Sequence, residues 1–300
     1  MEKDQSLQAS EEKNRVIGGM LYLVATPIGN LSDLSERAKK VLSEVDFVAA
    51  EDTRNSGKLL SCLGIKQEYV SYHEHNRKSR GPEIVARLQA GESCALVTDA
   101  GMPAISDPGE DLVRLCAEVG VPVTVIPGAC AAVSALALSA LATRRFAFEG
   151  FLPVPKAERK KRLSEIAHER RTMIFYEAPH KLTSTLTDLY DCFGDRKISL
   201  CRELTKLNEE ILRTTIKGAL TIYEERAPRG EYVLVLEGEE EMGLAPTQQS
   251  SSPTDALSPR EKVAYYENEG LSRMDAIKRA AKEMGVPKSE LYNLLHRDDE

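Results

Sequence analysis

Polar side chains follow four apolar runs of the sequence, at the points where each run predicts the end of a buried strand. In chain order these loops read "AAEDTR", "TDAGMPAISDPGEDLV", "FYEAPHKL" and "CRELTK". A carboxylate placed beside a hydroxyl can orient it or accept its proton. Because ligands of open α/β sheets bind outside the carboxyl ends of the strands, these loops are the first candidates for a site. A salt-bridged helix cap is the structural alternative for "AAEDTR", and a buried ion pair is the alternative for "CRELTK".

The loop between residues 98 and 113 holds more acids, glycines and prolines than a simple turn needs. Asp107, Pro108 and Glu110 have the spacing of the N-cap, N1 and N3 positions, so they are predicted to start the following helix. Asp99 has no such role. It lies at the carboxyl end of the predicted strand, where a ligand would bind.

Several common sites are excluded by pattern. The first loop, "ATPIGNLSD", lacks the G-x-G-x-x-G fingerprint of dinucleotide binding, and the chain has no G-x-x-x-x-G-K-[ST] phosphate loop. His73 and His75 have no third ligand at suitable spacing, so no metal site is predicted. In "VIPGACAAVS", Gly128 would let a ligand approach the backbone, although close packing is an alternative reason for small residues there.

Composition indicates a soluble globular protein with more than one domain. The 300 residues are 42% hydrophobic and 29% charged, and the six cysteines form no C-x-x-C pair. Reduced core thiols and a cytoplasmic location are therefore expected. No run approaches the roughly 20 apolar residues of a membrane helix. The net charge is −7, but residues 144–230 contain 18 Lys and Arg and only 13 Asp and Glu. This segment could therefore form a local basic surface that binds phosphates.

The pattern along the chain predicts five segments. Apolar strands alternate with helices, which indicates a mainly parallel sheet covered on both faces, followed by a second α/β domain with a mixed sheet. A segment rich in Pro, Ser and Gln is typical of a linker. The predicted segments are a disordered lead at 1–17, α/β domains at 18–143 and 144–238, a linker at 239–256 and a helical domain at 257–300.

The predicted helical domain has the pattern of a helix-turn-helix. Ser258, Pro259 and Glu261 form a helix-start signal, and "GVPKS" separates two further helices. Lys278 and Arg279 favour a nucleic-acid contact. A helical bundle for dimerisation or packing is the alternative.

Seven motifs together resemble the ribosomal small-subunit RNA (cytidine-2′-O)-methyltransferases of the tetrapyrrole methylase superfamily. They are "LYLVATPIGNLSDLSERA", "AAEDTR", "TDAGMPAISDPGEDLV", "VIPGACAAVSALALSAL", "FEGFLP", "IFYEAPHKL" and "CRELTK". The resemblance spans about residues 21–238. It implies a two-domain α/β class III methyltransferase with a small C-terminal helical domain, S-adenosyl-L-methionine in a cleft between the domains, and a homodimer.

The same resemblance implies a reaction and its residues. The reaction is 2′-O-ribose methylation of a cytidine in the decoding region of 16S ribosomal RNA, in an assembled small subunit and without a metal. Asp52 or Glu177 would orient the hydroxyl, and Arg54, Arg202 and Lys206 would hold the RNA backbone. The implied cofactor contacts are Ile28, Asp99, Gly101, Met102, Ala129, Cys130, Ala131, Tyr176 and Leu204.

Two other functions stay open from the sequence. The same fold methylates tetrapyrroles, so this chain could act on a tetrapyrrole or another small molecule. It could also bind RNA without catalysis, through its basic second domain and helical tail. The "EDTR" and "CRELTK" runs favour RNA over a macrocycle, and the intact strand-end loops favour catalysis.

Overall fold

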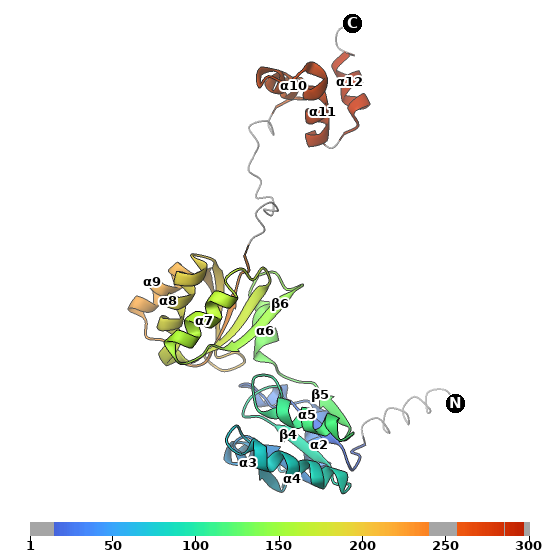
Figure 1. Cartoon of the computed structure of the whole chain (residues 1–300), viewed down its shortest axis with the longest axis vertical. Coiled ribbons are helices and arrows are strands. Elements are labelled where there is room, and N and C mark those ends of the chain that lie inside the picture. Colours follow the sequence, from blue (N-terminus) through green and yellow to red (C-terminus); the bar gives the residue numbers. More distant parts are fainter. Residues whose placement is uncertain (1–14, 240–256, 285, 297–300) are drawn as a thin grey trace, which may run out of the picture. The chain divides into compact units, whose positions relative to one another are not determined.

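A computed structural model describes residues 15–239, 257–284 and 286–296 (Figure 1). The chain divides into two compact units, one ending at Glu239 and one beginning at Glu240. The predicted linker lies outside the described residues except for Glu239, and so does the predicted disordered lead except for residues 15–17. No helix in the described ranges has both the length and the apolar character needed to span a membrane.

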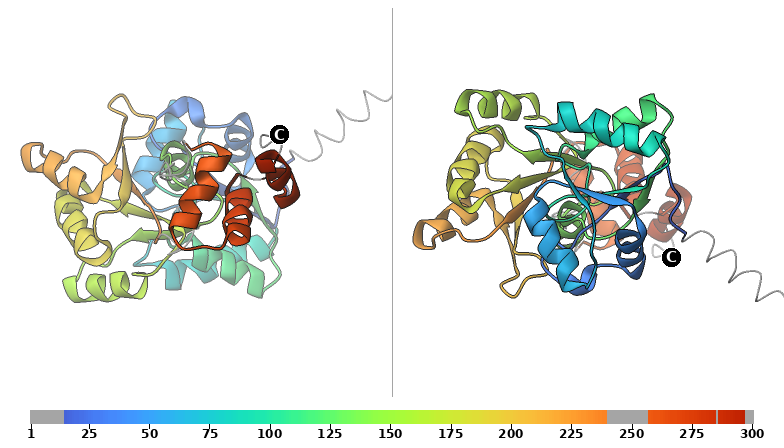
Figure 2. Two further views of the ribbon diagram at one scale, coloured as in Figure 1. Left: turned by 90° about the horizontal axis from the view of Figure 1, so that it is seen from above. Right: turned by 90° about the horizontal axis from the view of Figure 1, so that it is seen from below.

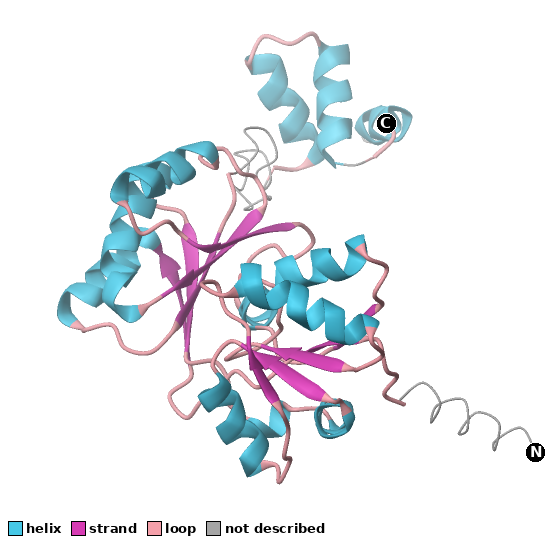
Figure 3. Ribbon diagram, turned by 60° about the horizontal axis from the view of Figure 1, so that its bottom comes forward, coloured by secondary structure: helices cyan, strands magenta, loops and turns pink. Residues whose placement is uncertain are grey.

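The first sheet is entirely parallel and has helices on both faces, as the sequence predicted (Figure 3). Its strand order is β3-β2-β4-β1-β5. Alternate residues of each strand point to opposite faces, so that Val48 and Ala95 join one core cluster while Phe47 and Cys94 join another. The strands are β1 (Leu21–Val24), β2 (Phe47–Ala50), β3 (Tyr69–Ser71), β4 (Cys94–Val97) and β5 (Val123–Ile126).

Four helices cover this sheet. Leu42 of α2 and Leu60 of α3 are buried on one face, and Ile84 of α4 and Leu112 of α5 are buried on the other. Fully burying a leucine or isoleucine side chain contributes roughly 1.5–3 kcal/mol, so these contacts fix the helices on the sheet. The helices are α2 (Glu36–Glu44), α3 (Thr53–Cys62), α4 (Arg77–Gln89) and α5 (Gly109–Glu118).

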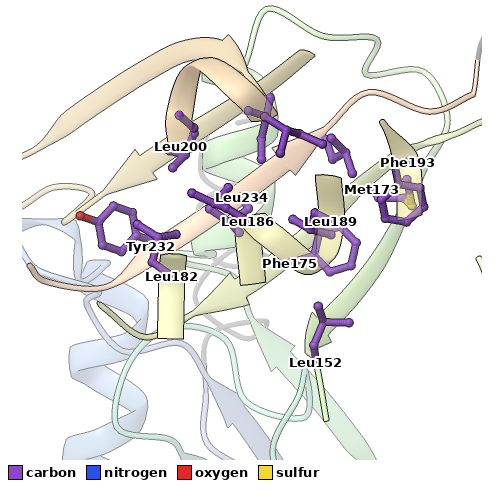
Figure 4. Packing of buried hydrophobic residues seen from close by; sticks show 14 of the residues in the cluster. Leu152, Met173, Phe175, Leu182, Leu186, Leu189, Phe193, Leu200, Tyr232 and Leu234 are labelled. Atoms are coloured by element: carbon purple, nitrogen blue, oxygen red, sulfur yellow. The ribbon is translucent and has the colours of Figure 1, made fainter. Parts of the chain in front are cut away.

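The second sheet is mixed, with the order β6-β7-β10-β8-β9. The β6–β7 pair is parallel, and the other pairs are antiparallel. On one face, Phe175 and Leu234 pack with Leu186 and Leu189 of α8 (Figure 4). The strands are β6 (Phe146–Phe151), β7 (Thr172–Glu177), β8 (Lys197–Arg202), β9 (Glu210–Thr215) and β10 (Tyr232–Leu236), and the helices are α7 (Lys156–Glu165), α8 (Leu182–Phe193) and α9 (Ile216–Glu225).

Helix α6 (Ala131–Leu138) connects the two sheets. It follows the last strand of the first sheet, yet Ala132, Ala135 and Leu136 pack against Ile174 and Val235 on the second sheet. Its sequence, "AAVSALAL", is apolar enough to lie in such a core. The helix therefore falls inside the predicted first domain but covers the other domain's sheet.

The second unit is a bundle of three helices (Figure 2), α10 (Pro259–Asn268), α11 (Arg273–Met284) and α12 (Lys288–His296). The predicted start signal is confirmed, because Ser258 and Glu261 form a capping box at α10. Val263, Ile277 and Leu291 bring one apolar residue from each helix into a shared core. The guanidinium of Arg279 lies 4.9 Å from the ring centroid of Tyr266. Arg279 thus covers part of the bundle.

Candidate functional site

A cavity of about 380 Å³ is formed by loops from both sheets of the first unit. The first sheet contributes the segments after β1, β2, β4 and β5, and the second contributes the ends of β6, β7 and β8. Strand β10 runs antiparallel to β7 and β8, with Tyr232 opposite both Glu177 and Arg202, so its first residues also reach the cavity. The cavity therefore lies at the carboxyl ends of the parallel strands, where α/β folds bind ligands.

Eight of the nine residues predicted to bind a cofactor line this one cavity. Ala129 does not line it, although its carbonyl oxygen lies 3.4 Å from where a Cβ on Gly101 would be. The fold thus gathers residues from five separate segments of the chain. Those that line the cavity are Ile28, Asp99, Gly101, Met102, Cys130, Ala131, Tyr176 and Leu204.

Gly101 joins the first loop to the loop after β4. Its N–H donates to the Thr26 carbonyl at 3.1 Å, and its own carbonyl accepts from the Thr26 N–H at 2.9 Å. Its φ is +86°, and an added Cβ would lie 3.2 Å from Cγ2 of Ile28. Only glycine adopts this conformation without strain, so the structure requires a glycine at this point of the cavity lining.

Gly128 has a packing role in this structure. A Cβ there would lie 2.8 Å from the Cβ of Ala25, which belongs to the segment after β1. The glycine therefore lets two strand-end loops touch. Gly29 likewise allows close contact between the two sheets, because a Cβ added at this position would lie 2.4 Å from Cγ of Lys206.

Two carboxylates of the first sheet are held by neutral donors. The Thr98 hydroxyl donates to Oε2 of Glu51 at 3.0 Å, and the Asn55 amide donates to Oδ2 of Asp99 at 3.2 Å. Both donors leave the charge of the carboxylate uncompensated. Glu51 and Asp99 thus present negative charge to the cavity.

Asp107 lines the cavity but acts mainly on the backbone, as its spacing predicted. Its Oδ1 accepts from the N–H of Gly109 at 2.8 Å and from that of Ala104 at 3.0 Å. Helix α5 begins at Gly109, one residue later than predicted, and Pro108 precedes it. These bonds stabilise a turn in which Ala104 and Ser106 have positive φ.

The cavity is strongly acidic overall. Six carboxylates line it against a single lysine, Lys206, whose ammonium pairs with Glu203 and with Glu231 at 2.9 Å each. Such a lining favours a cationic ligand. The six carboxylates belong to Glu51, Asp99, Asp107, Glu177, Glu203 and Glu231.

Glu203 is held in its charged form. A hydrogen bond from the Glu231 N–H, followed by one from the Lys206 ammonium, lowers the pKa of Glu203 below its ordinary value. Burial works to lower the pKa of Lys206, but its bonds to Glu203 and Glu231 outweigh burial and raise it. Glu203 also has a φ of +52°, a strained conformation at the cavity wall.

Glu177 and Asp52, the two predicted orienting residues, lie in different surroundings. Glu177 lines the cavity, is 5% exposed, and accepts from the Ala178 N–H at 2.8 Å and the Thr185 hydroxyl at 2.5 Å. Asp52 is not among the lining residues. It caps α3 through the Arg54 N–H at 2.8 Å. The hydrogen bond from the Arg54 guanidinium also lowers the pKa of Asp52.

The three predicted RNA-binding cations are likewise separated. The side chain of Arg54 is 86% exposed, and its guanidinium pairs with Asp52 at 3.1 Å. Arg202 is held inside by Glu210 at 3.2 Å and by the Asn208 carbonyl at 3.3 Å. Lys206 lies in the cavity wall. Of the three, Arg54 has by far the most exposed side chain.

An aromatic side chain marks the rim of the cavity. Phe151, at the end of β6, is 60% exposed, and its ring centroid lies 5.4 Å from that of Tyr176. Burial raises the pKa of Tyr176 to about 12, so its phenol is neutral at physiological pH. Ile105, from the loop after β4, is 46% exposed and lines the same cavity. The rim therefore pairs an apolar side chain from each sheet.

No group of three metal-ligating side chains occurs in the described residues. His73 and His75 follow β3, and their ring centroids lie 5.9 Å apart.

Comparison with known proteins gives both family and fold matches. The family described as Tetrapyrrole (Corrin/Porphyrin) Methylases matches residues 20–219. The protein named ribosomal RNA small subunit methyltransferase I of Synechocystis sp. is 46% identical over 277 residues, covering 92% of this chain and 97% of the relative. The protein of the same name from Halalkalibacterium halodurans is 45% identical over 298 residues, covering 99% of this chain and 100% of the relative.

Solved structures share the fold of the first unit. Uroporphyrin-III C-methyltransferase from Thermus thermophilus, in complex with S-adenosyl homocysteine, matches with a TM-score of 0.53 at 18% identity, covering 73% of this chain and 97% of that one. Cobalt precorrin-4 methyltransferase matches with a TM-score of 0.52 at 19% identity, covering 72% and 94%.

Proposed function

The chain belongs to the tetrapyrrole methylase family, and on that premise we propose that it methylates small-subunit ribosomal RNA with S-adenosylmethionine as the donor. The proposed acceptor is the 2′-hydroxyl of a cytidine in the decoding region. The acidic cavity between the two sheets carries the proposal, because S-adenosylmethionine is a cation that a carboxylate-lined pocket would attract. The names of the relatives and the bound S-adenosyl homocysteine of the solved neighbour support it.

The residues of the cavity fit this cofactor. A volume of about 380 Å³ lies within the range of small-molecule sites. Asp99 and Glu51 supply charge on the first sheet, while Ile28 and Leu204 supply apolar walls from opposite sheets. When bound, S-adenosylmethionine supplies an electrophilic methyl group on a sulfonium centre.

Glu177 is the residue we assign to the acceptor hydroxyl. Its carboxylate is buried and fixed by Ala178 and Thr185, yet it lines the cavity. A carboxylate held in this way could accept a hydrogen bond from a ribose hydroxyl, orient it and take up its proton. Alignment of the hydroxyl with the methyl group would supply much of the acceleration.

Phe151 is the residue we assign to the acceptor base. An exposed ring at the mouth of a cavity is a stacking surface for an unpaired base, and single-stranded RNA is often bound in this way. Ile105 faces the same cavity from the other sheet. A base held between them would place its own ribose at the cavity entrance.

The test is methyl transfer with purified components. Small subunits from a strain lacking this gene are incubated with the protein and S-adenosylmethionine carrying a labelled methyl group. Mass spectrometry of the digested RNA should then show one added ribose methyl on a cytidine. Wild-type cells should carry this methyl, and the deletion strain should lack it.

Three results would overturn the proposal in different ways. A methyl group on a base would refute the 2′-O acceptor. Transfer to uroporphyrinogen III, but not to small subunits, would favour the small-molecule alternative. Binding of RNA without any transfer would indicate a non-catalytic RNA-binding protein.

A further inference from the structure

A second concave surface, the α3 groove, lies on the first sheet's side of the molecule and has no part in the cavity. It has a volume of about 660 Å³ and lies between one face of α3 and the segment that leads to β3. The residues that matter to its chemistry are Arg54, Gly57, Lys58, Ser61, Lys66 and Tyr69. None of them lines the cavity.

The charge of the α3 groove is opposite to that of the cavity. Lys58 and Lys66 line it together with Arg54, whose guanidinium is paired with Asp52, and no acidic side chain lines it. Within the described part of the chain, no carboxylate pairs with Lys58 or Lys66, so their ammonium groups are available to an anion. An overall charge of −7 repels a polyanion, which makes a local basic groove the favourable place for phosphates.

Gly57 provides an independent reason to regard the groove as a binding surface. It lies in the middle of α3, where glycine destabilises a helix by roughly 0.5–1 kcal/mol relative to alanine. A Cβ added there would meet no atom within 4 Å, so packing does not require the glycine. Its effect is to leave bare backbone on the groove floor, where a ligand can approach closely.

Helix α3 also connects the groove to the cavity. The helix begins two residues after Glu51, which lines the cavity, and its Asn55 binds the carboxylate of Asp99. A strand of RNA with one ribose at the cavity entrance would therefore have neighbouring phosphates near this helix.

We propose that the α3 groove binds the phosphate backbone of the acceptor RNA next to the target nucleotide. This inference rests on the proposed function for the identity of the RNA. Lys58 and Lys66 neutralise the phosphates, the Gly57 backbone lets one phosphate approach the helix, and the acidic cavity keeps the rest of the backbone outside. The groove thereby sets the direction in which the strand crosses the entrance.

The test compares two charge-reversing double variants. Lys58→Glu with Lys66→Glu alters the groove, and Lys160→Glu with Lys217→Glu alters exposed lysines on α7 and α9, which cover the second sheet (Figure 1). Methyl transfer to small subunits from the deletion strain is measured for each. The groove variant should raise the KM for small subunits at least roughly tenfold over the control, with kcat and the affinity for S-adenosylmethionine unchanged. Equal KM values for the two variants would overturn the inference.

Gly57→Ala separates binding from folding. Alanine favours the helix, so this variant should unfold at the same temperature as wild type or a higher one, yet bind small subunits more weakly. Unchanged binding by Gly57→Ala would remove the role assigned to the bare backbone and count against the groove.

Direct binding keeps the inference testable if no methyl transfer is found. The probe is a single-stranded RNA oligonucleotide with the decoding-region sequence, titrated at several salt concentrations. The groove variant should reduce the slope of log K against log salt by about 0.7 for each lost phosphate contact. RNA should also slow the alkylation of Cys62, the exposed cysteine in the groove. Slower alkylation of Cys62 in the presence of polyglutamate but not of RNA would indicate an acidic protein partner and overturn the proposal.

Discussion

The side-chain amide of Asn55 donates a hydrogen bond to Oδ2 of Asp99 at 3.2 Å, which ties the first turn of α3 to the carboxyl end of β4. The bond fixes the carboxylate without neutralising it. We therefore assign Asn55 a positioning role in the proposed cofactor site, in which Asp99 is the residue proposed to contact the cofactor.

Asp99→Asn should weaken the binding of S-adenosylmethionine roughly tenfold to a hundredfold, because hydrogen bonds to charged groups contribute about 1.5–3 kcal/mol. Asn55→Ala should weaken it about fivefold, since it removes only one neutral donor. Calorimetry measures both affinities.

A double-mutant cycle tests whether the two residues act together. In the Asp99→Ala background, Asn55→Ala should have no further effect on affinity. Additive losses would mean that Asn55 acts on the cofactor by another route. An undiminished affinity in Asp99→Ala would show that the cofactor lies elsewhere.

Glu177→Gln keeps the shape of the buried side chain but removes its charge and its ability to accept a proton. Because Glu177 is assigned to the acceptor hydroxyl, kcat should fall by about 10²–10⁴-fold while the affinity for S-adenosylmethionine changes little. Single-turnover methyl transfer with saturating small subunits measures the chemical step.

Asp52→Asn is the matched control, because asparagine also caps helices well. Asp52 is bonded to Arg54 and does not line the cavity, so this variant should retain its kcat. If kcat instead falls in Asp52→Asn and not in Glu177→Gln, the two assignments must be exchanged.

Phe151→Ala should raise the KM for small subunits by roughly tenfold or more, because stacking of one base on an aromatic ring contributes about 1–3 kcal/mol. Phe151→Tyr should retain most of the affinity. Phe146→Ala supplies the control, since Phe146 is 40% exposed at the opposite end of β6. A similar KM for Phe151→Ala and Phe146→Ala would contradict the assigned stacking role.

The parallel sheet and the main cavity loops were predictable from the sequence, because both depend on residue types that are close together along the chain. Continuous apolar runs such as "CALV" predict buried parallel strands, and the surplus acid Asp99 after that run does line the cavity. Gly101 was named from the family resemblance, and it too lines the cavity, whereas its positive φ is a property that the structure adds.

Other residues reach the cavity only through tertiary contacts, so the local sequence did not predict them. Glu231 and Tyr232 reach the cavity only because β10 runs antiparallel between β7 and β8. Arg202 and Glu203 are adjacent in sequence, yet one binds Glu210 inside the fold and the other lines the cavity. Phe151 is exposed because β6 ends at this residue. The sequence alone does not show where that strand ends, because an aromatic residue is equally common inside a strand.

Glu203→Gln tests how far the charged pair with Lys206 stabilises the cavity wall. The pKa of Glu203 is lowered in the folded protein, so its carboxylate stabilises the fold above the ordinary pKa of about 4.5. This contribution is lost as the pH falls from there through the folded pKa, because the unfolded chain takes up the proton first. The free energy of unfolding in urea should therefore differ most between wild type and variant at pH 7, and the difference should shrink below about pH 4.5.

Glu158→Gln, at an exposed position of α7, should show no such trend. A difference that stays constant across this pH range would mean that the Glu203 side chain stabilises the wall by packing and not by its charge.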